Sequence, residues 1–148
     1  MPIDQSFVGR IYPPTAPYEV GREKIREFAD AINDPNPVYR DAAAAQALGY
    51  ADVIAPPTFA IVMTLPAGHQ VIDDPEIGID YSRVVHGEQR FVHNRPLQAG
   101  DVLQVVVTVD AIRAAAGNDL VTTRADVMTV GGEAVLTAYG TLVARGTA

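Results

Sequence analysis

In the second half of the chain, apolar and polar residues alternate in the way that is typical of half-buried strands. The alternation is clearest over residues 102–115. One set of alternate positions there is Leu103, Val105, Val107, Val109 and Ala111, and the opposite set includes Gln104, Thr108 and Asp110. Further strands are predicted at 84–93, 120–130 and 134–145, turns at 94–101, 117–119 and 131–132, and a short edge strand at 18–20. Long strands joined by short turns predict an antiparallel meander.

The first half of the chain has a helical pattern instead. Residues 21–32 repeat apolar side chains at helical spacing, with charged residues between them. The repeating residues are Ile25, Phe28, Ala29 and Ile32. A second, alanine-rich helix is predicted at 41–48, because Asp41 is a good N-cap and Gly49 is a typical residue after a helix end.

A third helix is predicted at residues 58–68, and it is apolar on nearly every side. Pro56 and Pro57 suit its start, since proline lacks the N–H group that has no partner in the first turn. The segment is too short to span a membrane, so burial inside the protein is expected. A sheet that curls around the helix would bury it. The pattern therefore predicts one α+β domain over residues 1–148 with the hot-dog arrangement.

A single hot-dog domain leaves one edge and one face of its sheet poorly covered. Exposed edges and apolar patches attract partners. We therefore expect a homodimer, or a heterodimer with a similar chain, in which the two sheets join into a longer one.

Charge and composition narrow the classes of partner. The net charge of -7 and the pI of about 4.7 indicate an acidic surface, which repels phosphate backbones, so no nucleic-acid partner is expected. No apolar run approaches the ~18 residues of a membrane span, and the first six residues do not resemble a signal peptide. The absence of cysteine excludes disulfides and thiol nucleophiles. These features favour a cytoplasmic protein without a membrane partner.

The loop at 31–41 separates the first two helices. Pro35 and Pro37 keep Asp34 and Asn36 out of the helical conformation, and Asp and Asn side chains readily bond nearby backbone. The expected result is a fixed polar loop. Such a loop can be a simple turn or can carry a functional site, and its own residues leave both interpretations open.

Four segments resemble one known family. They are 18–28 (Tyr-Glu-Val-Gly-Arg-Glu-Lys-Ile-Arg-Glu-Phe), 55–59 (Ala-Pro-Pro-Thr-Phe), 85–91 (Val-His-Gly-Glu-Gln-Arg-Phe) and 95–101 (Arg-Pro-Leu-Gln-Ala-Gly-Asp). The chain resembles the MaoC-like (R)-specific hydratases and dehydratases, which have the hot-dog fold. More narrowly, it is similar to the non-catalytic subunit of heterodimeric (3R)-hydroxyacyl-ACP dehydratases and to its uncharacterised relatives. The resemblance implies acyl-CoA or acyl-ACP as ligand, no cofactor, and a catalytic hot-dog subunit as partner.

The family's hydratase motif reads Asp-x-Asn-Pro-x-His, and the polar loop departs from it at one position. Asp34, Asn36 and Pro37 are in register, but Tyr39 stands where the family has its catalytic His. In the family, the Asp and the His activate a water molecule for addition to an enoyl thioester. This chemistry needs a proton carrier that titrates near the working pH, as His does at ~6.5 and Tyr, at ~10, does not. The resemblance therefore implies a substrate-binding subunit that lacks the motif His.

The same resemblance assigns a binding role to further residues. The acyl chain would lie along the central helix, and the pantetheine arm would pass between the polar loop and strand 84–93. The expected substrate-binding residues are Asn36, Tyr39, Pro57, Thr58, Phe59, Met63, Gly87 and Gln89. The family uses the start of the central helix as an oxyanion hole. Here Pro56 and Pro57 remove donors, which would leave the hole to Thr58 and Phe59, although ordinary helix initiation explains the prolines equally well.

The histidines leave two interpretations of His86 open. His86, beside Gly87, could replace the lost proton carrier and act with Asp34, or it could be a structural histidine. His69 is expected to cap the end of the central helix, and His93 is expected to face solvent. No His and Glu residues have metal-ligand spacing, so no metal site is expected.

Two alternatives to the binding subunit therefore remain. One is an active homodimeric (R)-specific hydratase that uses Asp34 and His86. The other is a non-enzymatic protein that binds acyl-CoA or regulates a partner.

Overall fold

A five-stranded antiparallel sheet forms the body of the molecule, in the strand order β1-β3-β4-β5-β2. The structure is a computed structural model that describes residues 2–147. The strands are β1 (Tyr18–Glu19), β2 (Val84–His93), β3 (Val102–Ala115), β4 (Asn118–Thr129) and β5 (Ala134–Ala144). The helices are α1 (Arg22–Ala31), α2 (Ala42–Ala47) and α3 (Ile61–Ile72), with short 3₁₀ helices η1 (Gln5–Phe7), η2 (Pro37–Tyr39) and η3 (Tyr81–Arg83).

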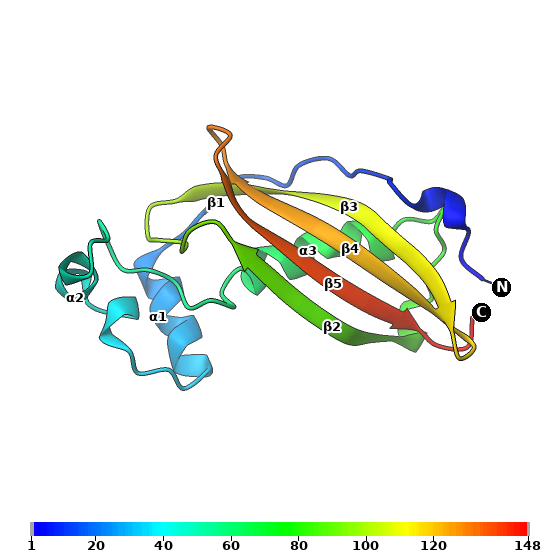
Figure 1. Cartoon of the computed structure of the whole chain (residues 1–148), viewed down its shortest axis with the longest axis horizontal. Helices are drawn as coiled ribbons and strands as arrows, with labels where there is room; N and C mark the ends of the chain where they lie inside the picture. Colours follow the sequence, from blue (N-terminus) through cyan, green and yellow to red (C-terminus); the bar gives the residue numbers. More distant parts are fainter. Residues whose placement is uncertain (1, 148) are drawn as a thin grey trace.

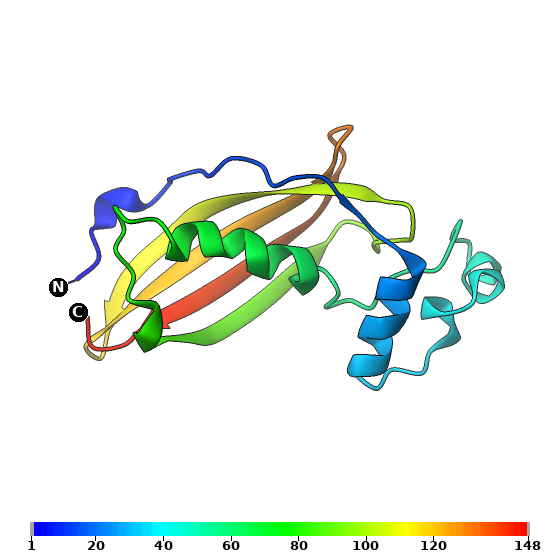
Figure 2. The ribbon, with the colours of Figure 1, turned by 180° about the vertical axis from the view of Figure 1, so that it is seen from behind.

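The sheet curls around α3, and α1 and α2 lie beyond one end of it (Figures 1 and 2). The predicted α+β class and the hot-dog arrangement are thus confirmed. In Figure 2, α3 lies in front of the sheet along the direction of the long strands. No helix within residues 2–147 combines the length and the apolar character that crossing a membrane requires.

As predicted, alternate residues of β3 from Leu103 to Val109 point into the hydrophobic core. The side chains of Leu103, Val105, Val107 and Val109 are all 0–1% exposed. The register then shifts between Val109 and Ala111, where a bulge adds Asp110 to the strand. Beyond the bulge Ile112 is buried and Ala111 is not, so the predicted inward position of Ala111 is wrong. A bulge inserts one residue and thereby moves every later side chain to the opposite face.

The central helix starts later and ends later than predicted. Residues 57–60 form a turn in which the Phe59 N–H donates to the Pro56 carbonyl oxygen at 2.9 Å, and α3 begins at Ile61. The helix then continues to Ile72, past Pro66 and Gly68. Packing of its buried face against β3 and β4 outweighs the poor helix propensity of these two residues.

The β3–β4 hairpin is tighter than the predicted turn at 117–119. Ala115 pairs with Asn118, so the turn consists of Ala116 and Gly117, with φ angles of 52° and 79°. Positive φ at both positions is typical of a type I′ hairpin turn, which matches the twist of the flanking strands. Asp119 consequently belongs to β4. It is 1% exposed and accepts hydrogen bonds from the Ile3 N–H at 3.1 Å and the Thr147 hydroxyl at 2.6 Å.

The two N-terminal helices form close to the predicted positions. Asp41 caps α2 by accepting a hydrogen bond from the Ala43 N–H at 2.9 Å, as predicted. Ile25 and Ala29 of α1 are buried, whereas Ile32 is 44% exposed because α1 ends at Ala31. Phe28 packs its ring edge-on against Phe59, with the ring centroids 5.5 Å apart. This contact joins the α1 region to the start of α3.

Candidate functional site

The loop between α1 and α2 is held by its own side chains, as the sequence predicts. The Asp34 carboxylate accepts a hydrogen bond from the Asn36 N–H at 3.1 Å, and the Asn36 side chain accepts one from the Val38 N–H at 3.0 Å. The second bond caps η2, whose last residue is Tyr39. Arg40 donates to the Asp34 carbonyl oxygen and pairs with Asp30. These contacts give Tyr39 a fixed position.

Tyr39 lies inward, with 8% of its surface exposed. Burial, and then the negative charge of Asp34, raises the pKa of the Tyr39 phenol. A phenol with a raised pKa stays protonated at neutral pH, so it can donate a hydrogen bond but cannot serve as a base. The position of the motif His is therefore occupied by a hydrogen-bond donor.

Tyr39 opens into a pocket of about 320 Å³, here called the Tyr39 pocket. Its lining residues are Tyr39, Ile54, Ala55, Pro57, His93, Asn94, Arg95 and Pro96. His93 is exposed, as predicted, but its Nε2 also lies 2.8 Å from the Pro57 carbonyl oxygen. This contact fixes the end of β2 against the segment that leads into α3.

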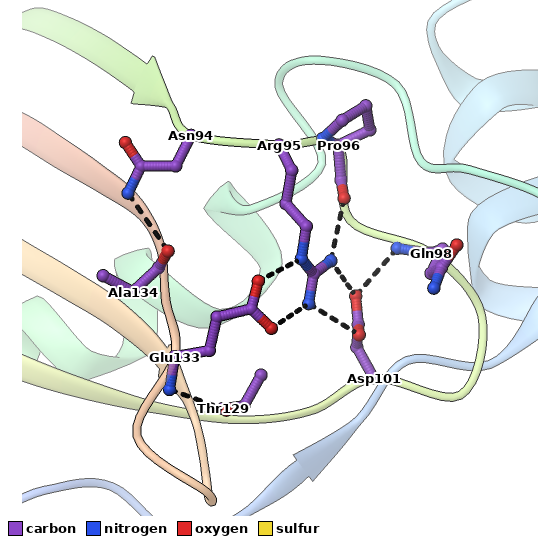
Figure 3. Close-up of polar contacts among 8 residues, drawn as sticks. All are labelled: Asn94, Arg95, Pro96, Gln98, Asp101, Thr129, Glu133 and Ala134. Carbon is purple, nitrogen blue, oxygen red and sulfur yellow. Dashed lines mark hydrogen bonds and ion pairs between the residues drawn. The ribbon is translucent and has the colours of Figure 1, made fainter. Parts of the chain in front are cut away.

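A group of ion pairs holds the wall of this pocket in place (Figure 3). The guanidinium of Arg95 donates to both carboxylate oxygens of Asp101, at 2.9 and 3.0 Å, and to Glu133 at 2.8 Å. Asp101 also accepts a hydrogen bond from the Gln98 N–H at 2.9 Å. These bonds raise the pKa of Arg95 and lower the pKa of Glu133. The Arg95 cluster (Arg95, Asp101 and Glu133) thus ties the loop after β2 to the β4–β5 hairpin.

A second hollow, here called the β2 groove, lies between the start of α3 and β2. It has a volume of about 530 Å³. Its lining residues are Phe28, Thr58, Ile61, Leu65, His86, Gly87, Glu88, Gln89 and Phe91. The groove therefore brings together three of the predicted binding residues, Thr58, Gly87 and Gln89, with the candidate catalytic residue His86.

Gly87 is required by the fold at the β2 groove. It lies at a register shift between His86 and Glu88. A Cβ atom at Gly87 would lie 3.0 Å from Cγ2 of Val143 on β5, which is closer than ordinary contacts. The structure thus supplies a packing reason for this glycine.

The remaining predicted binding residues lie elsewhere. Phe59 is fully buried and Met63 is 6% exposed, and neither lines the Tyr39 pocket or the β2 groove. The Phe59 N–H is already bonded to Pro56, which takes one donor from the expected oxyanion pair. Asn36 is exposed and serves as a cap. His69 lies in the last turn of α3, where its backbone carbonyl accepts from the Asp73 N–H at 2.8 Å.

A third hollow, here called the α3 chamber, lies between α3 and the sheet and has a volume of about 40 Å³. Its lining residues are Thr64, Leu65, Gly68, Ile72, His86, Gln89, Thr123, Ala125, Ala138, Gly140 and Leu142. Leu65, His86 and Gln89 also line the β2 groove, so the chamber adjoins that groove. Sequence reasoning missed Thr64, although it is the one hydroxyl in the apolar run 59–65.

Within one chain, the loop that contains Asp34 lies near the C-terminal end of β2, whereas His86 lies near the N-terminal end of this strand. The Asp34 loop meets the sheet through Tyr39, in the pocket that also contains His93. His86 lies seven residues before His93 on the same strand, a separation of about 23 Å at ~3.3 Å per residue. A site that uses both residues would therefore need the loop of a second chain. Within residues 2–147, no three His, Cys, Asp or Glu side chains are grouped so that they could hold a metal ion.

Comparison with known sequences finds a match to nearly the whole chain. A family model described as FAS1-like, dehydratase domain region matches residues 6–138. A UPF0336 protein from Saccharopolyspora erythraea is 64% identical over 148 residues, which make up 100% of this chain and 95% of that protein. A UPF0336 protein from Streptomyces avermitilis is 62% identical over 98% of this chain and 97% of that protein.

Solved structures are similar as well. A MaoC-like dehydratase is 38% identical, with a TM-score of 0.88 over 95% of this chain and 42% of that chain. A chain of the C-terminally truncated HadBC (3R-hydroxyacyl-ACP dehydratase) complex from Mycobacterium tuberculosis is 34% identical, with a TM-score of 0.83. That match covers 93% of this chain and 96% of the HadBC chain. The present chain thus spans less than half of the first structure and nearly all of the second.

Proposed function

Because this chain belongs to the FAS1-like dehydratase region family, among the MaoC-like hot-dog dehydratases, we propose that it binds an acyl thioester as the non-catalytic subunit of a hydratase or dehydratase. The thioester would be carried by CoA or by ACP. The proton chemistry would come from a second hot-dog subunit that has the complete Asp-x-Asn-Pro-x-His motif.

The observation that carries this proposal is the state of Tyr39. It stands in the motif register of the catalytic His, is buried, and has a raised pKa. General acid–base catalysis is most efficient when the pKa of the group lies near the working pH. The phenol is therefore suited to donating a hydrogen bond to a bound ligand and unsuited to moving a proton.

The edge of β2 supports a second hot-dog chain as the partner. Of the strands described, β2 pairs with β5 alone, so its other edge is open over ten residues. Val85 and Val92 on this strand are 41% and 46% exposed. An open strand edge beside exposed aliphatic side chains favours continuation of the sheet into another chain. The partner's motif loop would then meet the β2 groove.

Two of the similar structures fit this arrangement. The HadBC chain comes from a complex that is itself described as a (3R)-hydroxyacyl-ACP dehydratase. The MaoC-like dehydratase matches over 42% of its length, which leaves room for a second unit of similar size on the same polypeptide. Either arrangement would supply the missing His from outside the present fold.

Enzyme assays with crotonyl-CoA test the proposal. The purified chain alone should bind acyl-CoA in calorimetry but should not hydrate crotonyl-CoA at an enzymatic rate of ~1 per second or more. Co-purification with a hot-dog protein that has the full motif should yield turnover. Turnover by the chain alone would contradict the proposal, and so would the absence of acyl-CoA binding.

One observation favours an active homodimer as a second candidate. His86 lines the groove at the open β2 edge, where the Asp34 loop of a second copy would arrive if two copies paired there. In that case His86→Ala should abolish hydration by the chain alone while its circular dichroism spectrum stays native. Hydration that persists at the native rate in this variant would eliminate the candidate.

A further inference from the structure

The α3 chamber contains a polar group that the core does not satisfy. Thr64 is 7% exposed, and within residues 2–147 its buried Oγ1 has no hydrogen-bond partner. Hydroxyl groups in protein interiors nearly always have a partner, because burial without one is costly. Thr64 lines the chamber together with Gly68, which lies one turn further along α3. The chamber is therefore a place where a ligand atom would complete the bonding of a buried hydroxyl.

The wall opposite α3 is polar as well. Gln89, Gly140 and Thr123 are direct neighbours across β2, β5 and β4. A Cβ atom at Gly140 would lie 3.0 Å from Gln89 Oε1 and 3.8 Å from Thr123 Oγ1. Both oxygen atoms therefore converge over this glycine, on the side of the sheet that faces the chamber. Thr64 lines the same chamber as Gln89, so a hydroxyl group bound there would have Thr64 as a donor and Gln89 Oε1 as an acceptor.

The charge and the size of the chamber limit what it can hold. Its lining residues include no Asp, Glu, Lys or Arg, and His86 is the one titratable side chain among them, so an ionised group would lack a permanent countercharge. Its volume of about 40 Å³ exceeds the ~10–15 Å³ that one water molecule needs, and it is far smaller than the β2 groove at about 530 Å³. A neutral hydroxyl group fits both limits, and a long alkyl tail does not.

We propose that the α3 chamber binds a hydroxyl group at the distal end of the acyl chain. This inference rests on the binding role proposed above and names the substrate class, which is a hydroxylated acyl thioester. Leu65, His86 and Gln89 line both the chamber and the β2 groove, so a chain that enters from the open edge of β2 would pass these residues. Thr64 and Gln89 then select hydroxylated chains over plain alkyl chains of the same shape.

Calorimetry with matched CoA thioesters tests the inference. Each pair consists of an ω-hydroxyacyl-CoA and the alkyl acyl-CoA in which a methyl group replaces the hydroxyl, over a series of chain lengths. At the length that reaches the chamber, the native protein should bind the hydroxylated member about tenfold more tightly. Thr64→Val, which keeps the shape and removes the hydroxyl, should abolish this preference, and Thr64→Ser should keep it.

Thr108→Val is the matched control. Thr108 is also 7% exposed but lies outside the chamber, so its replacement should leave the preference unchanged. Equal affinity for both members of every pair would overturn the inference and leave the proposed function standing. Failure of both members to bind would overturn both. A crystal structure of the complex that shows water in the chamber and the ligand hydroxyl elsewhere would also overturn the inference.

Discussion

The Tyr39 pocket and the α3 chamber lie toward opposite ends of β2 and are built differently. The Tyr39 pocket has fixed walls, since His93 contacts Pro57 and the Arg95 cluster anchors the loop beside it. The α3 chamber contains a hydroxyl without a partner and adjoins a groove at an open strand edge. The pocket in the register of the catalytic motif is thus complete within one chain.

This difference indicates how binding and chemistry are divided. The walls of the Tyr39 pocket are already fixed by other contacts, so its protonated phenol is suited to positioning a ligand. A chamber with an unsatisfied hydroxyl at an open edge gains bonds when a ligand or a second chain arrives. We therefore expect substitutions in the Tyr39 pocket to change stability and affinity, and the catalytic effects to appear in the partner.

The largest expected effect concerns the proton carrier. In a complex with a catalytic hot-dog subunit, replacing the motif His of that subunit by Ala should lower kcat by about 10²–10⁴-fold. Tyr39→Phe in this chain should raise KM and leave kcat within about threefold, because it removes one hydrogen bond. Steady-state hydration kinetics separate the two parameters. A kcat loss from Tyr39→Phe as large as the loss from the His variant would show that the chemistry does not reside in the partner alone.

The next largest effect should come from the wall of the Tyr39 pocket. Asp101 is nearly buried, with 9% of its side chain exposed, and binds Arg95 through both oxygens. Asp101→Ala leaves the guanidinium without its main partner, which should lower the free energy of unfolding by about 2–4 kcal/mol. Urea denaturation measures this loss. Glu133→Gln is the control: Glu133 is the exposed member of the cluster, so a loss as large as that for Asp101→Ala would contradict the role given to Asp101.

A pH-dependent effect is expected beyond the far end of α3. Hydrogen bonds from Tyr12 at 2.6 Å and Arg10 at 2.8 Å lower the pKa of Asp74 from its ordinary 3.8 to about 2. Because the folded-state pKa is the lower one, this carboxylate stabilises the fold fully above pH ~4 and loses that contribution as the pH falls toward about 2.

Asp74→Asn should flatten the fall in stability over this pH range. Urea denaturation at a series of pH values measures the profile. Asp73→Asn, at the exposed neighbouring residue, should leave the profile unchanged. If both variants gave the native profile, the hydrogen bonds to Asp74 would not be the cause of the acid sensitivity.

The smallest effect should come from the β3–β4 hairpin. Ala116 holds a φ angle of 52°, which costs free energy for any residue with a Cβ atom. Ala116→Gly should therefore raise the free energy of unfolding by about 0.5–1 kcal/mol. Gly117→Ala should lower it, although a Cβ atom there meets nothing within 4 Å. Thermal unfolding measures both changes, and a gain from both variants would show that backbone strain is not the cause.

The fold could be predicted from the sequence because its two determinants are local. Alternation in the second half of the chain indicates strands, and a strongly apolar helix indicates a sheet packed against it. The expected burial on nearly every side of that helix is wrong, because Leu65 is 43% exposed. The bulge at Asp110 could not be predicted, because it depends on pairing between strands. The predicted end of α3 at Gly68 was wrong because packing with other segments outweighs the poor helix propensity of glycine. The sequence of the helix alone does not show that packing.

The candidate site could be predicted in part. The fixed polar loop could be predicted because the bonds of Asp34 and Asn36 go to backbone groups only two residues away. The other walls of the Tyr39 pocket come from distant segments, such as Ile54 and Arg95, whose meeting depends on the folded chain. The approach of the Gln89 side chain to the Thr123 hydroxyl likewise depends on the register of β2, β5 and β4, which cannot be predicted from the sequence.

The buried carboxylate of Asp119 has a consequence for evolution by gene fusion and permutation. It accepts hydrogen bonds from both Ile3 and Thr147, so residues near the two ends of the described chain contact the same carboxylate. Figure 1 shows both ends at the opposite end of the sheet from α1 and α2. A short peptide could therefore close the chain into a circle, or a tandem duplication could append a second domain, without crossing the Tyr39 pocket.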